Sequence, residues 1–398
     1  MNKLTLKETS WQVRDKALYA DKDLRENLYQ LDPSQLSTSF VDKVRNQAKS
    51  IACLVPACFL TQPTGPCQFK DSVPRLAQKV EDMMEKKGIF GEKEAFGDEL
   101  APGFGTAFLV GKQFVLTAAH CVCIEDSDKL CDERIRTTRL IFGFQMAQKK
   151  QSTYHFETKD IYQIKEVVSY SYRRFKSRQG AFEDWTDWAL LKLDREVEGH
   201  SPLPINFNNK VSNHVALYML GHPYGLAMKF TAHGSVKRNT HPDFFSCDLD
   251  AFNGNSGSPV FNKETGQVVG ILCGGGKDYE VTDNYRGTDQ RRIQAHRVTE
   301  LEGFEVCQRM SALRFLLDDH LLGLERQSEQ KSPELIIQAL KKQYQSRSTI
   351  PRLLHSSLPI QEIYTELVLL NNNKEIWMCI SFYRSMCRKL HGKTVRMP

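Results

Sequence analysis

The stretch NGNSGSP at residues 253–259 places one serine, Ser256, between two glycines. Glycine adopts backbone conformations that are costly for other residues, so this stretch can turn tightly and expose the serine hydroxyl. The same turn can aim the backbone N–H groups of Gly254 and Ser256 at one point, which is the geometry that stabilises an oxyanion. A serine hydroxyl alone is a weak nucleophile, so this chemistry needs a base and a group that orients the base.

A histidine and an aspartate suited to these tasks each adjoin an apolar run of β type. His120 follows the run FVLTAA, and Asp187 opens the run DWALLKL. An imidazole can accept the proton of the serine hydroxyl, and a carboxylate can hold the imidazole in the required tautomer. Asp184 is a nearby alternative to Asp187, but it lies outside the DWALLKL pattern.

The three segments occur in the order His, Asp, Ser, and LTAAHC, DWALLKL and GNSGSP resemble the trypsin/chymotrypsin-like serine peptidases. The string GHPYGLAMK that follows Leu220 is similar to bacterial cytosolic members in particular. Other serine hydrolases use the same groups in other chain orders, so the order discriminates between folds. An inactive relative is the alternative, although no residue of the predicted triad is substituted.

The resemblance implies a role for each of these residues. Ser256 is expected to attack the substrate, His120 to act as general base and then as general acid, and Asp187 to fix the imidazole and stabilise its charged form. The backbone N–H groups of Gly254 and Ser256 are expected to form the oxyanion hole.

The elements that must position these groups are predicted from short apolar runs separated by glycine and asparagine. Residues 105–110 and 113–117 are expected to form a hairpin that delivers His120, and residues 188–193 a buried strand beside Asp187. Similar short runs continue through the second half of the domain. The sequence therefore predicts a mainly β protein, a double antiparallel β-barrel of the trypsin-like type with helical N- and C-terminal extensions.

Changes in composition predict three segments. Residues 1–47 are a polar N-terminal arm, residues 48–305 the trypsin-like serine peptidase domain, and residues 306–398 a helical C-terminal extension. Within the domain, residues 72–88 carry apolar side chains at helical spacing and predict an inserted helix.

Composition limits the classes of protein to which the chain can belong. The chain has 398 residues, of which 40% are hydrophobic and 26% charged, and a formal net charge of +6. The charge is mild and spread along the chain, so we expect no nucleic-acid partner. No apolar run approaches the ~20 residues that span a bilayer, so we expect no membrane association. The first residues are charged throughout, so no conventional secretion signal is expected.

The 11 cysteines are irregularly spaced. Secreted relatives pair the cysteine after the catalytic histidine with one located sixteen residues upstream, where this chain has Gly105, and Phe252 replaces a cysteine near the nucleophile. The resemblance therefore implies reduced thiols and a cytoplasmic location, with a delivered effector that lacks a conventional signal as the alternative. No cysteine or histidine pair has zinc spacing, so we expect no metal and no cofactor.

The resemblance also indicates the residues that bind substrate. Asp250 lies six residues before the nucleophile, where this fold has the floor of the primary pocket, and a carboxylate there favours Arg or Lys at the cleavage site. The alternative is that Asp250 caps a turn. Leu272 stands where glutamyl endopeptidases have a histidine, so a preference for Glu is not expected. Gly274 and Gly275 are expected to leave an open strand edge for an extended peptide.

The sequence thus predicts a serine endopeptidase that cleaves protein or peptide substrates through an acyl-enzyme on Ser256. Animal relatives carry an aspartate before the serine that pairs with a newly cut N-terminus, but this chain has Asn255, so the arm need not be cleaved. The alternative is a protease-like effector or adaptor module of a multi-part sensor system, inactive until a regulatory partner docks through the C-terminal extension. The string LPIQEIY at residues 358–364 is similar to a linker in bacterial NACHT-type sensors.

Overall fold

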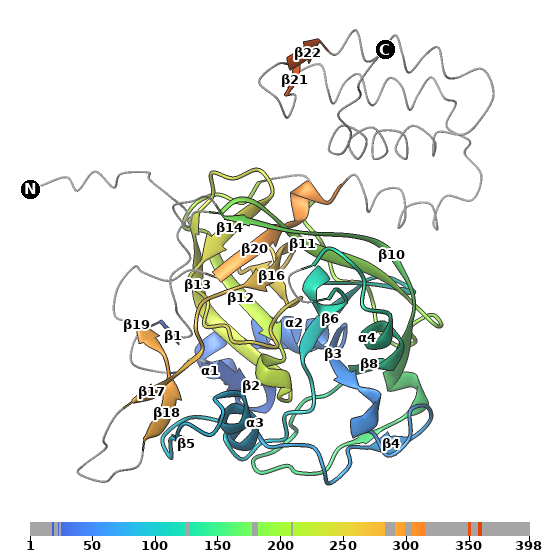
Figure 1. The fold of residues 1–398 in the computed structure, drawn as a ribbon, viewed down its shortest axis with the longest axis vertical. Coiled ribbons are helices and arrows are strands. Elements are labelled where there is room, and N and C mark those ends of the chain that lie inside the picture. The colour runs from blue at the N-terminus through green and yellow to red at the C-terminus, as the bar shows by residue number, and fades with distance from the viewer. Residues whose placement is uncertain are drawn as a thin grey trace, which may run out of the picture. The chain divides into compact units, whose positions relative to one another are not determined.

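Figure 1 shows the computed structural model of the chain, which divides into two compact units, Met1–Glu325 and Arg326–Pro398. In the second unit, the described residues form one antiparallel pair, β21 (Thr349–Pro351) with β22 (Ser357–Pro359). The helices predicted for the C-terminal extension lie outside the described residues. The structure describes residues 18–19, 23, 25–124, 127–176, 182–207, 210–282, 291–298, 305–314, 349–351 and 357–359.

Six antiparallel strands of the first unit close into a barrel in the order β10-β11-β7-β6-β3-β8. Their inward-facing side chains, such as Leu109, Val115 and Leu191, are fully buried in one apolar core, and this burial is the main favourable term in folding. The predicted hairpin is formed by β6 and β7. The bounds are β3 (Ile51–Pro56), β6 (Gly105–Gly111), β7 (Phe114–Thr117), β8 (Thr138–Phe142), β10 (Ile161–Lys176) and β11 (Phe182–Leu193).

A second ring of six strands follows the order β12-β15-β16-β20-β14-β13 and is closed by pairing of β12 with β13. Met219, Phe245 and Val260 are among the buried side chains of its core. The two closed rings confirm the predicted double antiparallel β-barrel. The bounds are β12 (Ala216–Gly221), β13 (Lys229–Arg238), β14 (Phe244–Cys247), β15 (Pro259–Asn262), β16 (Val268–Gly274) and β20 (Glu305–Arg309).

The last strand of the second barrel corrects the predicted end of the domain at residue 305. β20 pairs with β14 and β16, and Met310 and Leu313 after it are buried in the core. The barrel therefore continues through Leu313, and the boundary at 305 is wrong. All five residues of the EVCQR strand are buried although three are charged or polar, so its hydrophobicity pattern does not indicate a core strand.

The N-terminal arm is packed into the barrel unit from Arg25 onward. β2 (Arg25–Asn27) pairs with β13 as an additional strand, and α1 (Pro33–Leu36) and α2 (Thr38–Ala48) follow it. The side chain of Gln47 joins α2 to the second barrel, because it accepts a hydrogen bond from the Tyr218 hydroxyl at 2.7 Å and donates one to the carbonyl of Gly266 at 2.8 Å.

The inserted helix predicted at residues 72–88 is present but shorter, as α3 (Leu76–Met83). Pro74 lies just before it, and the residue preceding a proline is biased away from helical conformation, so the helix starts later than the pattern suggested. Leu76 and Val80 are buried against an apolar cluster that includes Tyr224, Phe252 and Tyr279. Nearby, a three-stranded sheet contains β5 (Ile89–Phe90), β17 (Tyr279–Thr282) and β18 (Arg292–Ala295).

The remaining elements are short. In the part of the chain that the structure describes, no helix has both the length and the apolar character needed to cross a bilayer. Two of the short elements are strand pairs, β1 (Leu18–Tyr19) with β19 (Arg297–Val298) and β4 (Cys67–Gln68) with β9 (His155–Phe156). The others are the helix α4 (Asp132–Thr137) and the 3₁₀ turns η1 (Leu28–Gln30), η2 (Ala57–Phe59), η3 (Ala119–Cys121), η4 (Thr158–Asp160), η5 (Pro223–Gly225) and η6 (Met310–Ala312).

Candidate active site

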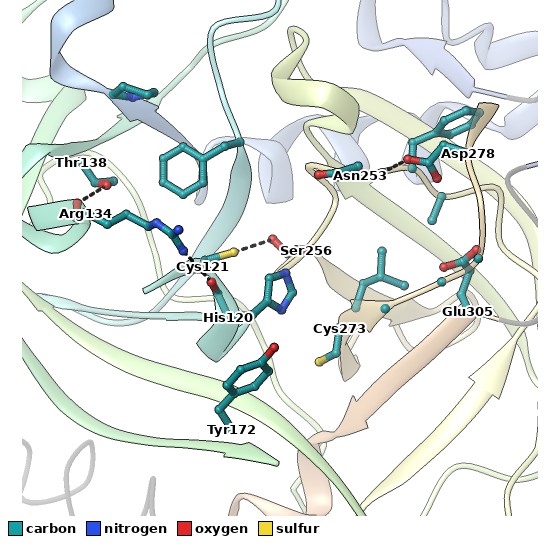
Figure 2. A pocket seen from close by; sticks show the side chains of 18 of the residues that line it. His120, Cys121, Arg134, Thr138, Tyr172, Asn253, Ser256, Cys273, Asp278 and Glu305 are labelled. Carbon is teal, nitrogen blue, oxygen red and sulfur yellow. Dashed lines mark hydrogen bonds between the residues drawn. The ribbon is translucent and has the colours of Figure 1, made fainter. Parts of the chain in front are cut away.

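Residues from both barrels line one cavity of about 690 Å³ (Figure 2). The first barrel contributes the predicted base. The second barrel contributes the predicted nucleophile and the glycines at and just after the end of β16. The lining residues used below are His120, Cys121, Asn253, Ser256, Leu272, Gly274, Gly275, Asp278 and Glu305.

His120 and Asp187 lie within hydrogen-bonding distance because neighbouring strands of the first barrel carry them. β7 ends at Thr117 and pairs with β11, which contains Asp187. The turn η3 then places Nδ1 of His120 2.7 Å from Oδ2 of Asp187. The backbone N–H of His120 donates to Oδ1 of the same carboxylate at 3.0 Å. The structure thus brings together the predicted base and the predicted orienting group.

The second barrel supports Asp187, whose side chain is fully buried. The Asp187 backbone N–H donates to Oε1 of Gln308 at 3.3 Å, and Sγ of Cys273 donates to the Asp187 carbonyl at 2.9 Å. Burial alone lowers the pKa of His120, but the adjacent Asp187 carboxylate outweighs this effect and raises the pKa above its ordinary value. Because Nδ1 faces the carboxylate, Nε2 is the ring nitrogen that faces away from Asp187.

The loop that carries Ser256 is held against the first barrel by Thr106 of β6. The backbone N–H of Thr106 donates to the Ser256 carbonyl at 2.8 Å, and the Thr106 hydroxyl donates to the Gly254 carbonyl at 2.9 Å. A side chain at Gly257 would place its Cβ 2.0 Å from the Thr106 carbonyl oxygen, and this residue also has a φ of +88°. Only glycine fits there, which explains the second glycine of the motif.

The peptide group that joins Asn253 to Gly254 is held at both ends. The Asn253 N–H donates to Oδ2 of Asp278 at 2.8 Å, and the Asn253 carbonyl accepts a hydrogen bond from the Tyr224 N–H. In a trans peptide the next N–H points opposite to the carbonyl, so the Gly254 N–H points away from Tyr224. Within the described chain, the N–H groups of Gly254 and Ser256 donate no hydrogen bond, whereas that of Asn255 donates to Phe252.

Two charged residues next to this loop, Asp278 and Lys79, were not predicted from the sequence. Burial raises the pKa of Asp278 to about 6, although hydrogen bonds from Asn253 and Tyr224 and the charge of Arg25 oppose the rise. Lys79 of α3 donates hydrogen bonds from its Nζ to three backbone carbonyls, those of Ala101, Gly103 and Tyr224. Neither residue belongs to a motif, so the sequence contains no signal for them.

His222, in the GHPYGLAMK string, supports this region from inside the protein. Its side chain is fully buried, its Nδ1 lies 2.9 Å from the carbonyl oxygen of Leu226, and its ring stacks on Phe144. Burial lowers the pKa of His222 to about 4, so the ring is neutral near pH 7. The burial indicates a structural role for His222.

The structure places Asp250 away from the cavity. Asp250 is 2% exposed and is not among the described residues that line the cavity. It lies instead near the guanidinium of Arg25. Burial alone would lower the pKa of Arg25, but the charges of Asp23 and, more weakly, Asp250 raise it above its ordinary value. The position six residues before the nucleophile is thus occupied by a buried carboxylate whose charge acts on an arginine of the N-terminal arm.

The other predicted substrate-binding residues, Leu272, Gly274 and Gly275, do line the cavity. A Cβ added at Gly275 would lie 2.0 Å from a carboxylate oxygen of Glu305, so the Glu305 side chain occupies the space beside this glycine. Glu305 is 2% exposed and lines the same cavity (Figure 2). Glu305 was not predicted as a site residue, because the predicted domain ends at this position.

Gly105 and Cys121, the two positions that the secreted relatives are expected to join, lie side by side in the structure. A Cβ at Gly105 would lie 2.9 Å from Sγ of Cys121, so the glycine occupies the place beside Cys121 where the resemblance puts a cysteine. Cys121 and the other eight cysteines of the described chain form no disulfide with one another.

Residues 105–271 match the family model of the trypsin-like peptidase domain. The match starts at the first residue of β6, ends within β16, and includes His120, Asp187 and Ser256. It covers 167 of the 398 residues (271 − 105 + 1). Together with the two closed barrels, it confirms the predicted trypsin-like fold. No curated protein matches the chain.

Several solved structures are similar to the chain at low identity. An inactive serine-to-alanine mutant of Rv3671c from M. tuberculosis has 12% identity and a TM-score of 0.35, with 75% of this chain and 97% of that chain covered. A second structure, of the Rv3671c protease in its inactive form, has 14% identity, a TM-score of 0.35, and coverages of 72% and 96%. The serine endoprotease from Yersinia pestis has 16% identity, a TM-score of 0.35, and coverages of 73% and 68%.

The contact between His120 and Asp187 predicts a measurable titration. In the wild type, NMR should give a pKa for the His120 imidazole above its ordinary ~6.5, because the carboxylate stabilises the charged ring. In Asp187→Asn the charge is gone while burial remains, so the pKa should fall below that value. His222, whose pKa is lowered to about 4, is the internal control and should be unchanged. Equal His120 pKa values in the two proteins would contradict the assigned contact.

Proposed function

We propose that the chain is a serine endopeptidase that cleaves peptide bonds through an acyl-enzyme on Ser256. The observation that supports this most directly is the 2.7 Å contact between His120 and Asp187 in a trypsin-like domain, at a cavity that Ser256 also lines. The order of the three residues along the chain supports the same conclusion.

In the proposed reaction, Oγ of Ser256 attacks the substrate carbonyl carbon while Nε2 of His120 takes the hydroxyl proton. Asp187 keeps the ring in the tautomer with Nδ1 protonated and stabilises the imidazolium that forms. The N–H groups of Gly254 and Ser256 donate to the oxyanion of the tetrahedral intermediate. The C–N bond then breaks as His120 returns the proton to the leaving amine, and a water activated by His120 hydrolyses the ester in the same way.

An enzyme that is active as an isolated chain is favoured over a module that waits for a partner. The Asn253 carbonyl is already bonded to the Tyr224 N–H, so the Gly254 N–H points away from Tyr224 without any partner present. A regulatory partner on the C-terminal extension remains a separate hypothesis, and it predicts labelling of Ser256 only after that partner is added.

We further propose that the substrate carries Arg or Lys at the cleavage site and that Glu305, not Asp250, binds this side chain. Glu305 lines the cavity next to Gly275, whereas Asp250 is buried and is not among the described residues that line the cavity. A buried carboxylate in a cavity gains most from a cationic partner with which it can form charge-assisted hydrogen bonds. The glycines beside it leave room for an extended peptide to pair with the end of β16.

The nucleophile is tested with a fluorophosphonate probe and a peptide substrate on the purified full chain. We expect the wild type to be labelled, and Ser256→Ala to lose labelling and to lose hydrolysis by more than about 10⁴-fold. Ser258→Ala is the matched control in the same motif, because Oγ of Ser258 is buried and has no partner in the described chain. Labelling that persists in Ser256→Ala would refute the assignment.

Specificity is tested by the ratio of kcat/KM for Arg or Lys substrates to kcat/KM for an uncharged analogue. Glu305→Gln should reduce this ratio by about 10- to 100-fold, because it removes a charge-assisted hydrogen bond and keeps the shape of the side chain. Asp250→Asn should leave the ratio unchanged even if the overall rate falls. The opposite pattern, with the ratio reduced only in Asp250→Asn, would show that Asp250, not Glu305, binds the basic side chain.

A further inference from the structure

A buried arginine from the N-terminal arm lies directly behind the loop that carries the predicted oxyanion hole. Arg25 is on β2, opposite Thr231 of β13, and is only 5% exposed. Its guanidinium carbon lies 3.7 Å from the centre of the Phe252 ring, a distance typical of a strong cation–π contact. Phe252 immediately precedes Asn253, whose peptide group orients the Gly254 N–H.

The charge environment shows why an arginine is tolerated at this buried position. Asp23, two residues earlier in the arm, accepts hydrogen bonds from Nε at 2.9 Å and from Nη2 at 2.6 Å. The negative charge of Asp250 also acts on the guanidinium, more weakly than that of Asp23. A buried ion pair is costly to break, because the remaining charge stays in a poorly solvated site. Removing Arg25 would therefore disturb Asp250 and the segment that leads from it into Phe252.

The same arginine sits on the aromatic cluster that holds the Asn253 peptide. The Phe252 ring contacts the rings of Tyr279 and Tyr224, with centres 5.6 and 6.3 Å apart. Tyr224 supplies the N–H that binds the Asn253 carbonyl, and Tyr279 follows Asp278, which binds the Asn253 N–H. One anchor of the peptide thus belongs to the aromatic cluster that Arg25 contacts, and the other directly precedes a member of that cluster.

We propose that the N-terminal arm is a built-in activating segment, in which Arg25 is the positioning residue that holds the loop of residues 251–257 in its catalytic conformation. Arg25 acts through Phe252 and Asp250 and does not itself touch the substrate. The proposal rests on the proposed function for its kinetic consequences, but its structural consequence, an ordered loop, can be measured separately.

The structural test is hydrogen–deuterium exchange of a peptide that covers residues 251–258 in the full chain. Arg25→Ala should accelerate exchange in this peptide about tenfold or more, because the amides of Asn253, Asn255 and Gly257 lose protection. The matched control is Arg309→Ala, which removes another buried arginine that lies over a phenylalanine, Phe245. It should lower stability without selective exchange in the loop. Equal loop protection in wild type and Arg25→Ala would overturn the proposal.

The kinetic test uses conditions in which each variant is folded by its melting curve. Arg25→Ala should lower kcat by about 10- to 100-fold with little change in KM, because misplacing an oxyanion donor affects the transition state. Millimolar ethylguanidinium, which can refill the space of the lost side chain, should restore kcat in Arg25→Ala but not in Arg309→Ala. A folded Arg25→Ala with wild-type kcat would also overturn the proposal.

The two tests distinguish the failure of one proposal from the failure of the other. If the wild type neither hydrolyses peptides nor reacts with the probe, but Arg25→Ala still loosens the loop, the proposed function is wrong. Arg25 is then still the residue that positions the loop. If the wild type is active and Arg25→Ala leaves both loop and kcat unchanged, the proposed function stands and the role of Arg25 is refuted.

Discussion

The arrangement of the site depends on one fully buried threonine, Thr106, which joins the loop of the second barrel to the first barrel. Its N–H and hydroxyl bind the carbonyls of Ser256 and Gly254, and its own carbonyl accepts a hydrogen bond from the hydroxyl of Thr117, three residues before His120. The His222 N–H also donates to the Thr106 hydroxyl, at 3.1 Å. A short chain of hydrogen bonds thus fixes Ser256 relative to the segment that delivers His120.

The second barrel contributes in return to the first. Gln308 and Cys273 bind the backbone of Asp187, so the carboxylate beside His120 is held from both barrels. Behind the loop, the arm adds the buried charge of Arg25 with its partner Asp23, and the loop before β17 adds the half-buried carboxylate of Asp278. Buried charges are costly unless they are paired, so each one makes the site depend on its partner being present. This coupling explains how a site assembled from distant segments can have a single geometry.

The sequence was sufficient to predict the features that arise from short patterns. The two barrels, the β6–β7 hairpin and the contact between His120 and Asp187 follow from apolar runs and the order of three motifs. β20 was missed because Glu305 and Arg309 are charged yet buried, and hydrophobicity patterns treat such residues as exposed. Asp250 was placed in the pocket because Arg25, on which its charge acts in the folded protein, is 225 residues away along the chain. A pairing of this kind depends on tertiary structure and leaves no local signal.

The central claim is that His120 and Ser256 act as one catalytic unit, and non-additivity tests it most directly. The measurement is kcat for peptide hydrolysis in wild type, Ser256→Ala, His120→Ala and the double variant. Residues that act together lose nearly all their contribution when either is removed, so the double variant should be within a few-fold of each single variant. Losses that multiply in the double variant would show that the two side chains act independently and would contradict the account.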